Sequence, residues 1–151
     1  MIDGLFGAGL NKPLSGGFAA VVQYINASQS TVVSIDTPSG LMGEDNTYNV
    51  RQNIIQADLT LTIQLPKLSF LFAENEEYVG KWEVLDIGIS QEFMKNVTTP
   101  YYITEEAEVR SFIRPYKKFT HKGMRGHGLL IAGSYGMGGA AVMAAQACMR
   151  S

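Results

Sequence analysis

The stretch from Val32 to Leu41 constrains this chain more than any other. It begins as a short, mostly apolar run with several β-branched residues, a pattern typical of a buried strand in a parallel sheet. The run ends on Asp36, after which Pro38 and Gly40 favour a sharp turn. In open α/β sheets, ligands bind just beyond the carboxyl ends of the strands. We therefore expect Asp36 and Ser39 to lie where chemistry takes place.

Composition excludes several classes of protein. The 151 residues are 46% hydrophobic and 17% charged, which is typical of a globular protein and excludes disorder. A formal net charge of −2 argues against a nucleic-acid or membrane-surface partner. The N-terminus lacks the pattern of a signal peptide, and no apolar run approaches the about 20 residues of a membrane span. The single cysteine, Cys148, predicts a reducing compartment, the cytoplasm, and we expect its side chain to be packed rather than reactive.

A crossover unit surrounds the central stretch. The first residues predict the end of a strand at Asp3, which leads into a glycine-rich loop at Gly7–Pro13. An amphipathic helix is predicted over Phe18–Ala27, with one apolar side formed by Ala19, Val22 and Ile25. A strand, a helix and a second strand in this order make a parallel crossover. The strand ends at Asp3 and Asp36 could therefore face a shared crevice.

Two further strands follow. Leu59–Ile63 alternates β-forming residues, and Trp82–Ile89 is a second strand candidate. The segment between Asp36 and the first of these strands is predicted as a loop with a short helix at Val50–Gln56. Leu68–Phe72 is a compact apolar segment.

The composition changes near Thr98–Pro100. Thr104 is predicted to cap a helix whose first turn is acidic. A strand at Leu129–Ala132, a glycine-rich loop at Gly133–Gly139 and a helix at Ala140–Met149 follow. One strand and one helix cannot bury a core of their own. We therefore expect a piece that spans the junction of two domains and exposes apolar surface.

The candidate functional groups have structural alternatives. The Gly7–Pro13 loop could approach a phosphate through its backbone N–H groups, or it could be a tight turn. Asp36 and Ser39 could bind a cation or a sugar, whereas Asp36 could instead accept backbone hydrogen bonds in a turn. Lys67 follows Pro66 and is predicted to be a solvated charge.

The second half of the chain offers weaker candidates. His121–Gly123 and the Gly133–Gly139 loop could form a nucleotide-binding corner, or only a turn between a strand and a helix. His127 is predicted to be structural.

Ordered blocks of the chain resemble two known families. Asp3–Leu10, Ile35–Leu41 and Leu65–Leu68 resemble the YjeF N-terminal family, the NAD(P)H-hydrate epimerases, which have a Rossmann-like fold. His121–Gly126 and Ile131–Ala141 resemble the opening of the ADP/ATP-dependent NAD(P)H-hydrate dehydratases, which are ribokinase-like.

The resemblance implies an α/β chain in three parts. Residues 1–97 would be the C-terminal part of an epimerase domain with a three-layer parallel sheet. Residues 98–118 would be a linker with a lead-in helix, and residues 119–151 the truncated start of a ribokinase-like domain with its first βα unit.

The same resemblance implies the repair of damaged nicotinamide nucleotides. The epimerase would interconvert the R and S hydrates of NADH or NADPH, and the dehydratase would use ADP or ATP with Mg²⁺ to return the S form to NAD(P)H. Asp3 and Ser39 would bind K⁺, and Asp36 would be the catalytic residue that transfers a proton. The hydrate would contact Gly7, Ala8, Gly9, Leu10, Asn11, Lys12, Pro13, Asp36 and, in the later part, Ala140. The full-length protein would be a homo-oligomer.

The chain departs from both families in places. Thr37 stands where the epimerases usually have Ile or Val, and Gly138 stands where the dehydratases commonly have Pro. The epimerase family's Asn-Gly-Gly-Asp-Gly loop does not occur in this sequence, so we expect this piece to be incomplete as an enzyme. The alternatives are a non-catalytic module that binds a nucleotide or a protein, and a piece of a sugar or nucleoside kinase.

Overall fold

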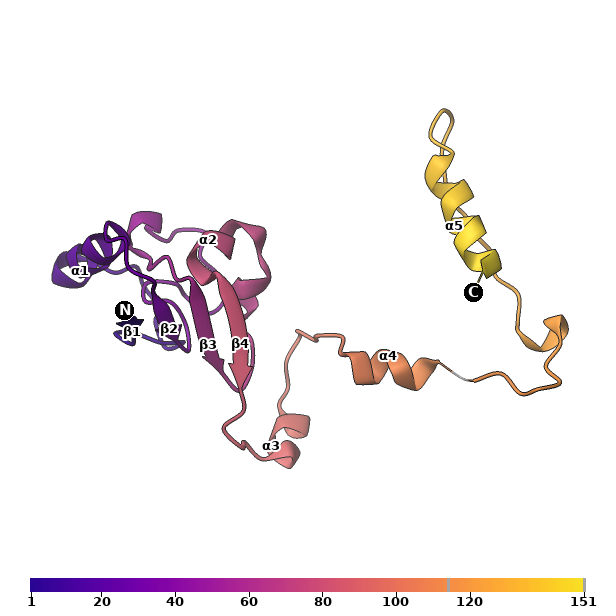
Figure 1. Cartoon of the computed structure of the whole chain (residues 1–151), viewed down its shortest axis with the longest axis horizontal. Coiled ribbons are helices and arrows are strands. Elements are labelled where there is room, and N and C mark those ends of the chain that lie inside the picture. The colour runs from indigo at the N-terminus through magenta and orange to yellow at the C-terminus, as the bar shows by residue number, and fades with distance from the viewer. Residues whose placement is uncertain (114, 151) are drawn as a thin grey trace. The chain divides into compact units, whose positions relative to one another are not determined.

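The computed structural model describes residues 1–113 and 115–150. The chain divides into two compact units, Met1–Thr98 and Thr99–Ser151, which are coloured indigo to rose and orange to yellow in Figure 1. No helix in the described ranges is both long enough and apolar enough to cross a membrane.

The first unit is built on a four-stranded parallel sheet in the order β1-β2-β3-β4 (Figure 1). The strands are β1 (Ile2–Asp3), β2 (Val33–Ile35), β3 (Leu59–Ile63) and β4 (Lys81–Leu85). Because all four strands are parallel, their carboxyl ends meet at one edge of the sheet. This confirms the predicted parallel α/β sheet, which is consistent with a Rossmann-like domain.

Helix α1 (Gly16–Asn26) connects β1 to β2 and confirms the predicted crossover helix. Ala19 and Val22 are buried, as their spacing predicted, and Ile25 packs at the margin of the core. The buried cluster beneath this helix consists of Leu14, Val22, Val32, Ile55 and Ala57. A second cluster, next to α2 (Glu76–Val79), consists of Leu41, Ile54, Phe70, Tyr78 and Val79.

The short connecting elements differ from the predictions in detail. The helix expected at Val50–Gln56 is a 3-10 turn, Arg51–Asn53. The apolar segment after β3 forms two such turns, Leu68–Leu71 and Ala73–Asn75. Strand β4 ends at Leu85 and not at Ile89 as predicted.

The early end of β4 has a local cause. The carboxylate of Asp86 accepts a hydrogen bond from Gly88 N at 2.8 Å, and Gly88 has φ +76°. A turn of this kind takes the backbone out of the extended conformation. The chain then enters helix α3 (Gln91–Asn96).

The two faces of the sheet have an unusual distribution of polarity. By register, Asp3, Ser34 and Thr60 share one face, and all three are buried. The opposite face carries Ile2, which is 77% exposed, and Ile35, which is 39% exposed. The three-layer form of the prediction requires a second covered face, whereas these apolar side chains are in contact with solvent. The exposed apolar surface expected from the sequence is therefore present.

The second unit contains α4 (Glu106–Phe112), a 3-10 turn (Lys122–Met124) and α5 (Gly139–Arg150). Helix α5 confirms the predicted helix at Ala140–Met149. The cap of α4 is Glu105 and not Thr104.

Two further predictions for the second unit are wrong. Leu129–Ala132 does not form a strand, because no described segment pairs with it through backbone hydrogen bonds; the bridge Ser134–Met137 is isolated. Cys148 is exposed, because no residue of α5 is buried. The ribokinase-like start of this unit stays a prediction.

Two buried threonines of the first unit provide a test of the core. Thr37 and Thr60 are both 0% exposed, but Thr60 Oγ1 donates to Val79 O at 2.7 Å, whereas Thr37 Oγ1 has no partner. We expect Thr37→Val to raise the free energy of unfolding by about 1 kcal/mol, because it removes an unsatisfied buried hydroxyl. Thr60→Val should lower it by about 1 kcal/mol. Denaturant unfolding of both variants measures the two changes in the free energy of unfolding. A Thr37→Val variant less stable than the unaltered protein would contradict the conclusion that Thr37 Oγ1 is unsatisfied.

Candidate functional site at the carboxyl ends of the strands

Asp3, the last residue of β1, is a buried carboxylate that is 2% exposed. Its Oδ2 accepts hydrogen bonds from Ser34 Oγ and from Ser39 N, both at 2.8 Å. Its Oδ1 accepts from Ser39 Oγ at 2.6 Å and from Leu5 N at 3.4 Å. Asp3 therefore joins β1 to β2 and to the turn that follows β2.

The Asp3 carboxylate has no cationic side-chain partner among the described residues. No Lys, Arg or His nitrogen in the described ranges lies within 4.0 Å of its carboxylate. The oxygen atoms gathered here are those of Asp3, the Ser39 hydroxyl and the Phe6 carbonyl, which lies 3.3 Å from Ser39 Oγ. Carboxylate, hydroxyl and carbonyl oxygens are the donors that hard cations prefer. The predicted ligands Asp3 and Ser39 are thus adjacent and chemically suited to K⁺.

The same residues do not suit a transition metal. The part of the chain that the structure describes contains no group of three or more His, Cys, Asp or Glu side chains arranged to hold a metal ion. The set around Asp3 has one carboxylate and otherwise neutral oxygens, so any cation bound here would need further ligands.

Asp36 lies directly after β2 and has an unusual backbone conformation. Its φ is +68°, in the left-handed region that non-glycine residues rarely adopt. Its backbone N donates to Leu61 O at 2.8 Å, which ties the strained residue to β3. Backbone strain of this kind is concentrated at functional sites.

The Asp36 carboxylate has three partners from three different segments. Oδ1 forms an ion pair with Lys67 Nζ at 2.8 Å and accepts from Ile63 N at 3.3 Å. Oδ2 accepts from Ala8 N at 3.0 Å. Burial raises the pKa of Asp36, but the hydrogen bonds from Lys67, Ala8 and Ile63 and the charge of Lys67 outweigh it, so the pKa lies below its ordinary value of 3.8. Asp36 is therefore ionised at neutral pH.

The glycine-rich loop meets Asp36 at its first two residues. A Cβ at Gly7 would lie 2.9 Å from Asp36 Oδ2, so only glycine permits this approach without displacement. Leu10 N donates to Gly7 O at 3.3 Å, and the Leu10 side chain packs against the core.

The remaining loop residues differ in their environment. Gly9, Asn11 and Lys12 are exposed, and Pro13 is half-buried. The structure thus brings Gly7, Ala8 and Asp36 together. Ala140 lies at the start of α5, in the second unit.

The sequence is similar to those of known proteins. The family model of the YjeF-related protein N-terminus matches residues 1–69. The bifunctional NAD(P)H-hydrate repair enzyme Nnr of Vibrio cholerae is 33% identical over 152 residues, which cover 100% of this chain and 30% of that protein. The NAD(P)H-hydrate epimerase of Lentilactobacillus buchneri is 40% identical over 89 residues, 59% of this chain and 40% of that protein.

Residues 1–69 are thus similar to the YjeF-related protein N-terminus.

The similarity extends beyond the matched family segment. The bifunctional enzyme of Moorella thermoacetica is 34% identical over 151 residues, which cover 100% of this chain and 28% of that protein. The chain therefore spans less than a third of the length of these bifunctional relatives. The resemblance to the YjeF-related family, predicted from blocks such as Asp3–Leu10, is confirmed.

Lys67 is a residue of this sheet edge whose contact with Asp36 the sequence prediction missed. It was expected to be a solvated charge, but it pairs with Asp36 and its side chain is only 17% exposed. The position of Lys67 could have indicated this contact, because the residues after β3 lie at the same edge of the sheet as those after β2. A lone lysine is usually solvent-exposed, so spacing alone did not distinguish the two cases.

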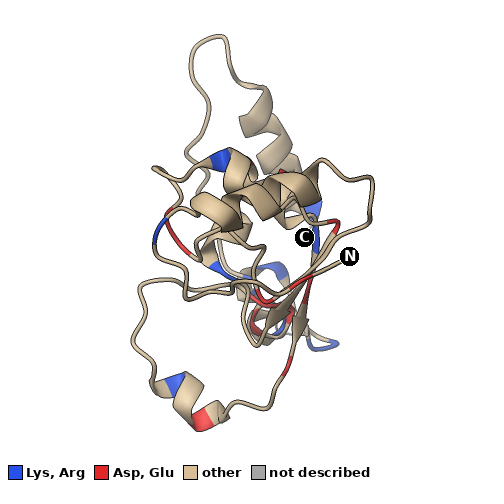
Figure 2. Cartoon of the chain, turned by 90° about the vertical axis from the view of Figure 1, so that its left-hand side faces the viewer, with Lys and Arg blue, Asp and Glu red and all other residues tan. Residues whose placement is uncertain are grey.

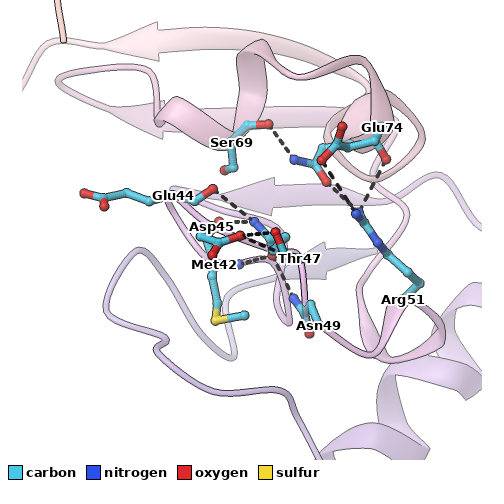
Figure 3. A network of polar contacts seen from close by, with 10 residues as sticks. Met42, Glu44, Asp45, Thr47, Asn49, Arg51, Ser69 and Glu74 are labelled. Atoms are coloured by element: carbon cyan, nitrogen blue, oxygen red, sulfur yellow. Dashed lines mark hydrogen bonds and ion pairs between the residues drawn. The ribbon is translucent and has the colours of Figure 1, made fainter.

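The turn after Ser39 is fixed by a polar network in the first unit (Figure 3). Asn49 Nδ2 donates to Gly40 O at 2.8 Å, and Asn46 bonds the backbone of Met42 through both ends of its amide. Gly40 has φ +98°, and a Cβ there would lie 2.1 Å from Asn53 O. This network fixes the turn that follows Ser39, whose N and Oγ both donate to Asp3.

Figure 2 marks the Lys and Arg positions in blue and the Asp and Glu positions in red along the ribbon of the chain.

The contact between Gly7 and Asp36 provides the second test. We expect Gly7→Ala to lower the melting temperature by several degrees, because its methyl group would collide with Asp36 Oδ2. Gly4→Ala is the matched control, since no atom lies within 4 Å of a Cβ at Gly4. Thermal unfolding of both variants gives the comparison. Equal melting temperatures for the two variants would refute the close approach.

Proposed function

We propose that this chain supplies part of the active site of an NAD(P)H-hydrate epimerase, within a longer protein that also dehydrates the S hydrate with ADP or ATP. The observation that carries the proposal is the convergence of Asp3, Ser39, Asp36 and the Gly7–Ala8 backbone at one sheet edge. The names of the relatives, an epimerase and bifunctional repair enzymes, support the same reaction.

The substrate of this proposal is a hydrated NADH or NADPH. Its phosphates would lie along the Gly7–Pro13 loop, whose glycines allow close approach of backbone N–H groups. Its hydrated nicotinamide ring would meet Asp36, beside the first residues of the same loop.

Asp36 is the proposed group for proton transfer. Its carboxylate is ionised at neutral pH because the hydrogen bonds and the charge of Lys67 hold its pKa low despite burial. An ionised carboxylate can accept a proton or a hydrogen bond from the ring, and fixed geometry makes that contact effective.

K⁺ is the proposed ion at Asp3 and Ser39. When bound, it would supply a positive charge beside the substrate phosphates and balance the Asp3 carboxylate. The role of Asp3 itself is structural as well, because it joins β1 to the turn at Ser39.

The remaining parts of the proposal concern the longer protein. Its dehydratase part would take ADP or ATP with Mg²⁺, and Ala140 would contact the hydrate there. We also propose a Rossmann-like fold for the first unit, a ribokinase-like fold for the second domain, a cytoplasmic location and a homo-oligomer.

Substitution of Asp36 tests the division of labour. We expect Asp36→Asn to lower kcat for epimerisation at least 100-fold in the full-length protein, while dehydration of the S hydrate continues. Asn is the matched change because it tolerates positive φ and keeps the shape of the side chain. Separate assays of the two reactions on purified hydrates measure the effect. Equal losses of both activities would refute the division, and no epimerisation by the unaltered protein would favour a non-catalytic module.

A further inference from the structure

The ammonium group of Lys67 is held at three points. It pairs with Asp36 Oδ1 at 2.8 Å and donates to the carbonyls of Ile63 and Leu65, each at 3.2 Å. An ammonium group has three donors, so these contacts use all of them. Lys67 therefore has no free donor for a phosphate, although it lies at the edge where a phosphate would bind.

The two oxygens of Asp36 are in different situations. Oδ1 is held by Lys67 and by Ile63 N. Oδ2 accepts one hydrogen bond, from Ala8 N, and lies so close to the backbone of Gly7 that a Cβ there would be 2.9 Å from it. A carboxylate oxygen can accept two hydrogen bonds, so Oδ2 keeps capacity on the side of the glycine-rich loop.

The backbone near Lys67 is strained in a way that serves this contact. Gln64, directly after β3, has φ +62°, and Asp36, directly after β2, has φ +68°. The conformation of Gln64 turns the chain so that Lys67 returns to the carbonyl of Ile63. The Gln64 side chain holds the turn, since its Oε1 accepts from Ile87 N at 3.0 Å. Two adjacent strand ends are thus strained around one ion pair.

We propose that Lys67 is a positioning residue, which fixes Asp36 through Oδ1 so that Oδ2 is the oxygen that contacts the hydrated nicotinamide ring. This inference rests on the proposed epimerase function and assigns the atom at which it acts. Lys67 contributes to turnover through Asp36 and does not bind the substrate.

The experiment compares three variants of the full-length protein. Lys67→Met removes the ammonium and keeps an unbranched side chain, and Lys67→Arg keeps the charge but changes its geometry. Lys81→Met is the control, because Lys81 is exposed and lies at the opposite end of its strand from the site. Epimerisation kinetics give kcat and KM, and a carbon-13 NMR titration follows the pKa of the Asp36 carboxyl.

The proposal predicts a specific combination of results. Lys67→Met should lower kcat about 10- to 100-fold with KM within about threefold of the unaltered protein. The pKa of Asp36 should rise, since burial then acts with less opposition. Lys67→Arg should keep the pKa low and recover part of kcat, and Lys81→Met should match the unaltered protein.

Other results would overturn the proposal. A higher KM with unchanged kcat in Lys67→Met would mean that Lys67 binds substrate. Unchanged kcat, KM and Asp36 pKa would mean that the ion pair is incidental. Where Lys67→Met does not fold, Lys67→Arg decides, since a kcat and KM identical to those of the unaltered protein would show that geometry is unimportant. If the unaltered protein has no epimerase activity, the proposed function fails and the titration alone tests whether Lys67 holds Asp36.

Discussion

The need to compensate two carboxylates at the sheet edge governs this structure. Removal of a carboxylate from water costs several kcal/mol unless hydrogen bonds or an opposite charge replace its hydration. Asp36 receives a cation, Lys67, together with backbone N–H groups. Asp3, which is more deeply buried, receives two hydroxyl groups and backbone N–H groups but no cation among the described residues. Because of this difference, we propose Asp36 as the contact of the nicotinamide ring and Asp3 as the cation site.

The partners of these carboxylates also organise the chain around them. Asp3 joins β1 to Ser34 on β2 and to the turn at Ser39. Asp36 joins the loop after β1 to the residues after β3. Three strand ends are thus coupled through side chains. This arrangement strains the backbone at Asp36, which has a positive φ. It also requires glycine at position 40, because a Cβ there would collide with neighbouring backbone atoms.

Much of the fold was predictable because it depends on local patterns. The strand at Leu59–Ile63 and the helix after the glycine-rich loop follow from periodicity, and both are confirmed. The strand at Leu129–Ala132 failed because a strand requires a pairing partner that its own sequence does not reveal. Strand order predicted that Asp3 and Asp36 end at one edge of the sheet, whereas the pairing of Asp3 with Ser39 was implied only by the family resemblance. The contact between Lys67 and Asp36 was missed, since it depends on the left-handed turn at Gln64, a residue type with no strong preference for that conformation.

The most direct test of the charge-compensation account is the effect of K⁺ on stability. A cation bound only by the folded state raises its stability by an amount that grows with concentration. In KCl, compared with tetramethylammonium chloride at equal ionic strength, the protein should melt at a higher temperature, and Asp3→Asn should lose that increment. Glu83→Gln is the control, because Glu83 is an exposed carboxylate in the middle of β4, outside the site. Equal stabilisation of Asp3→Asn and the unaltered protein, or no stabilisation of either, would contradict a cation site at Asp3.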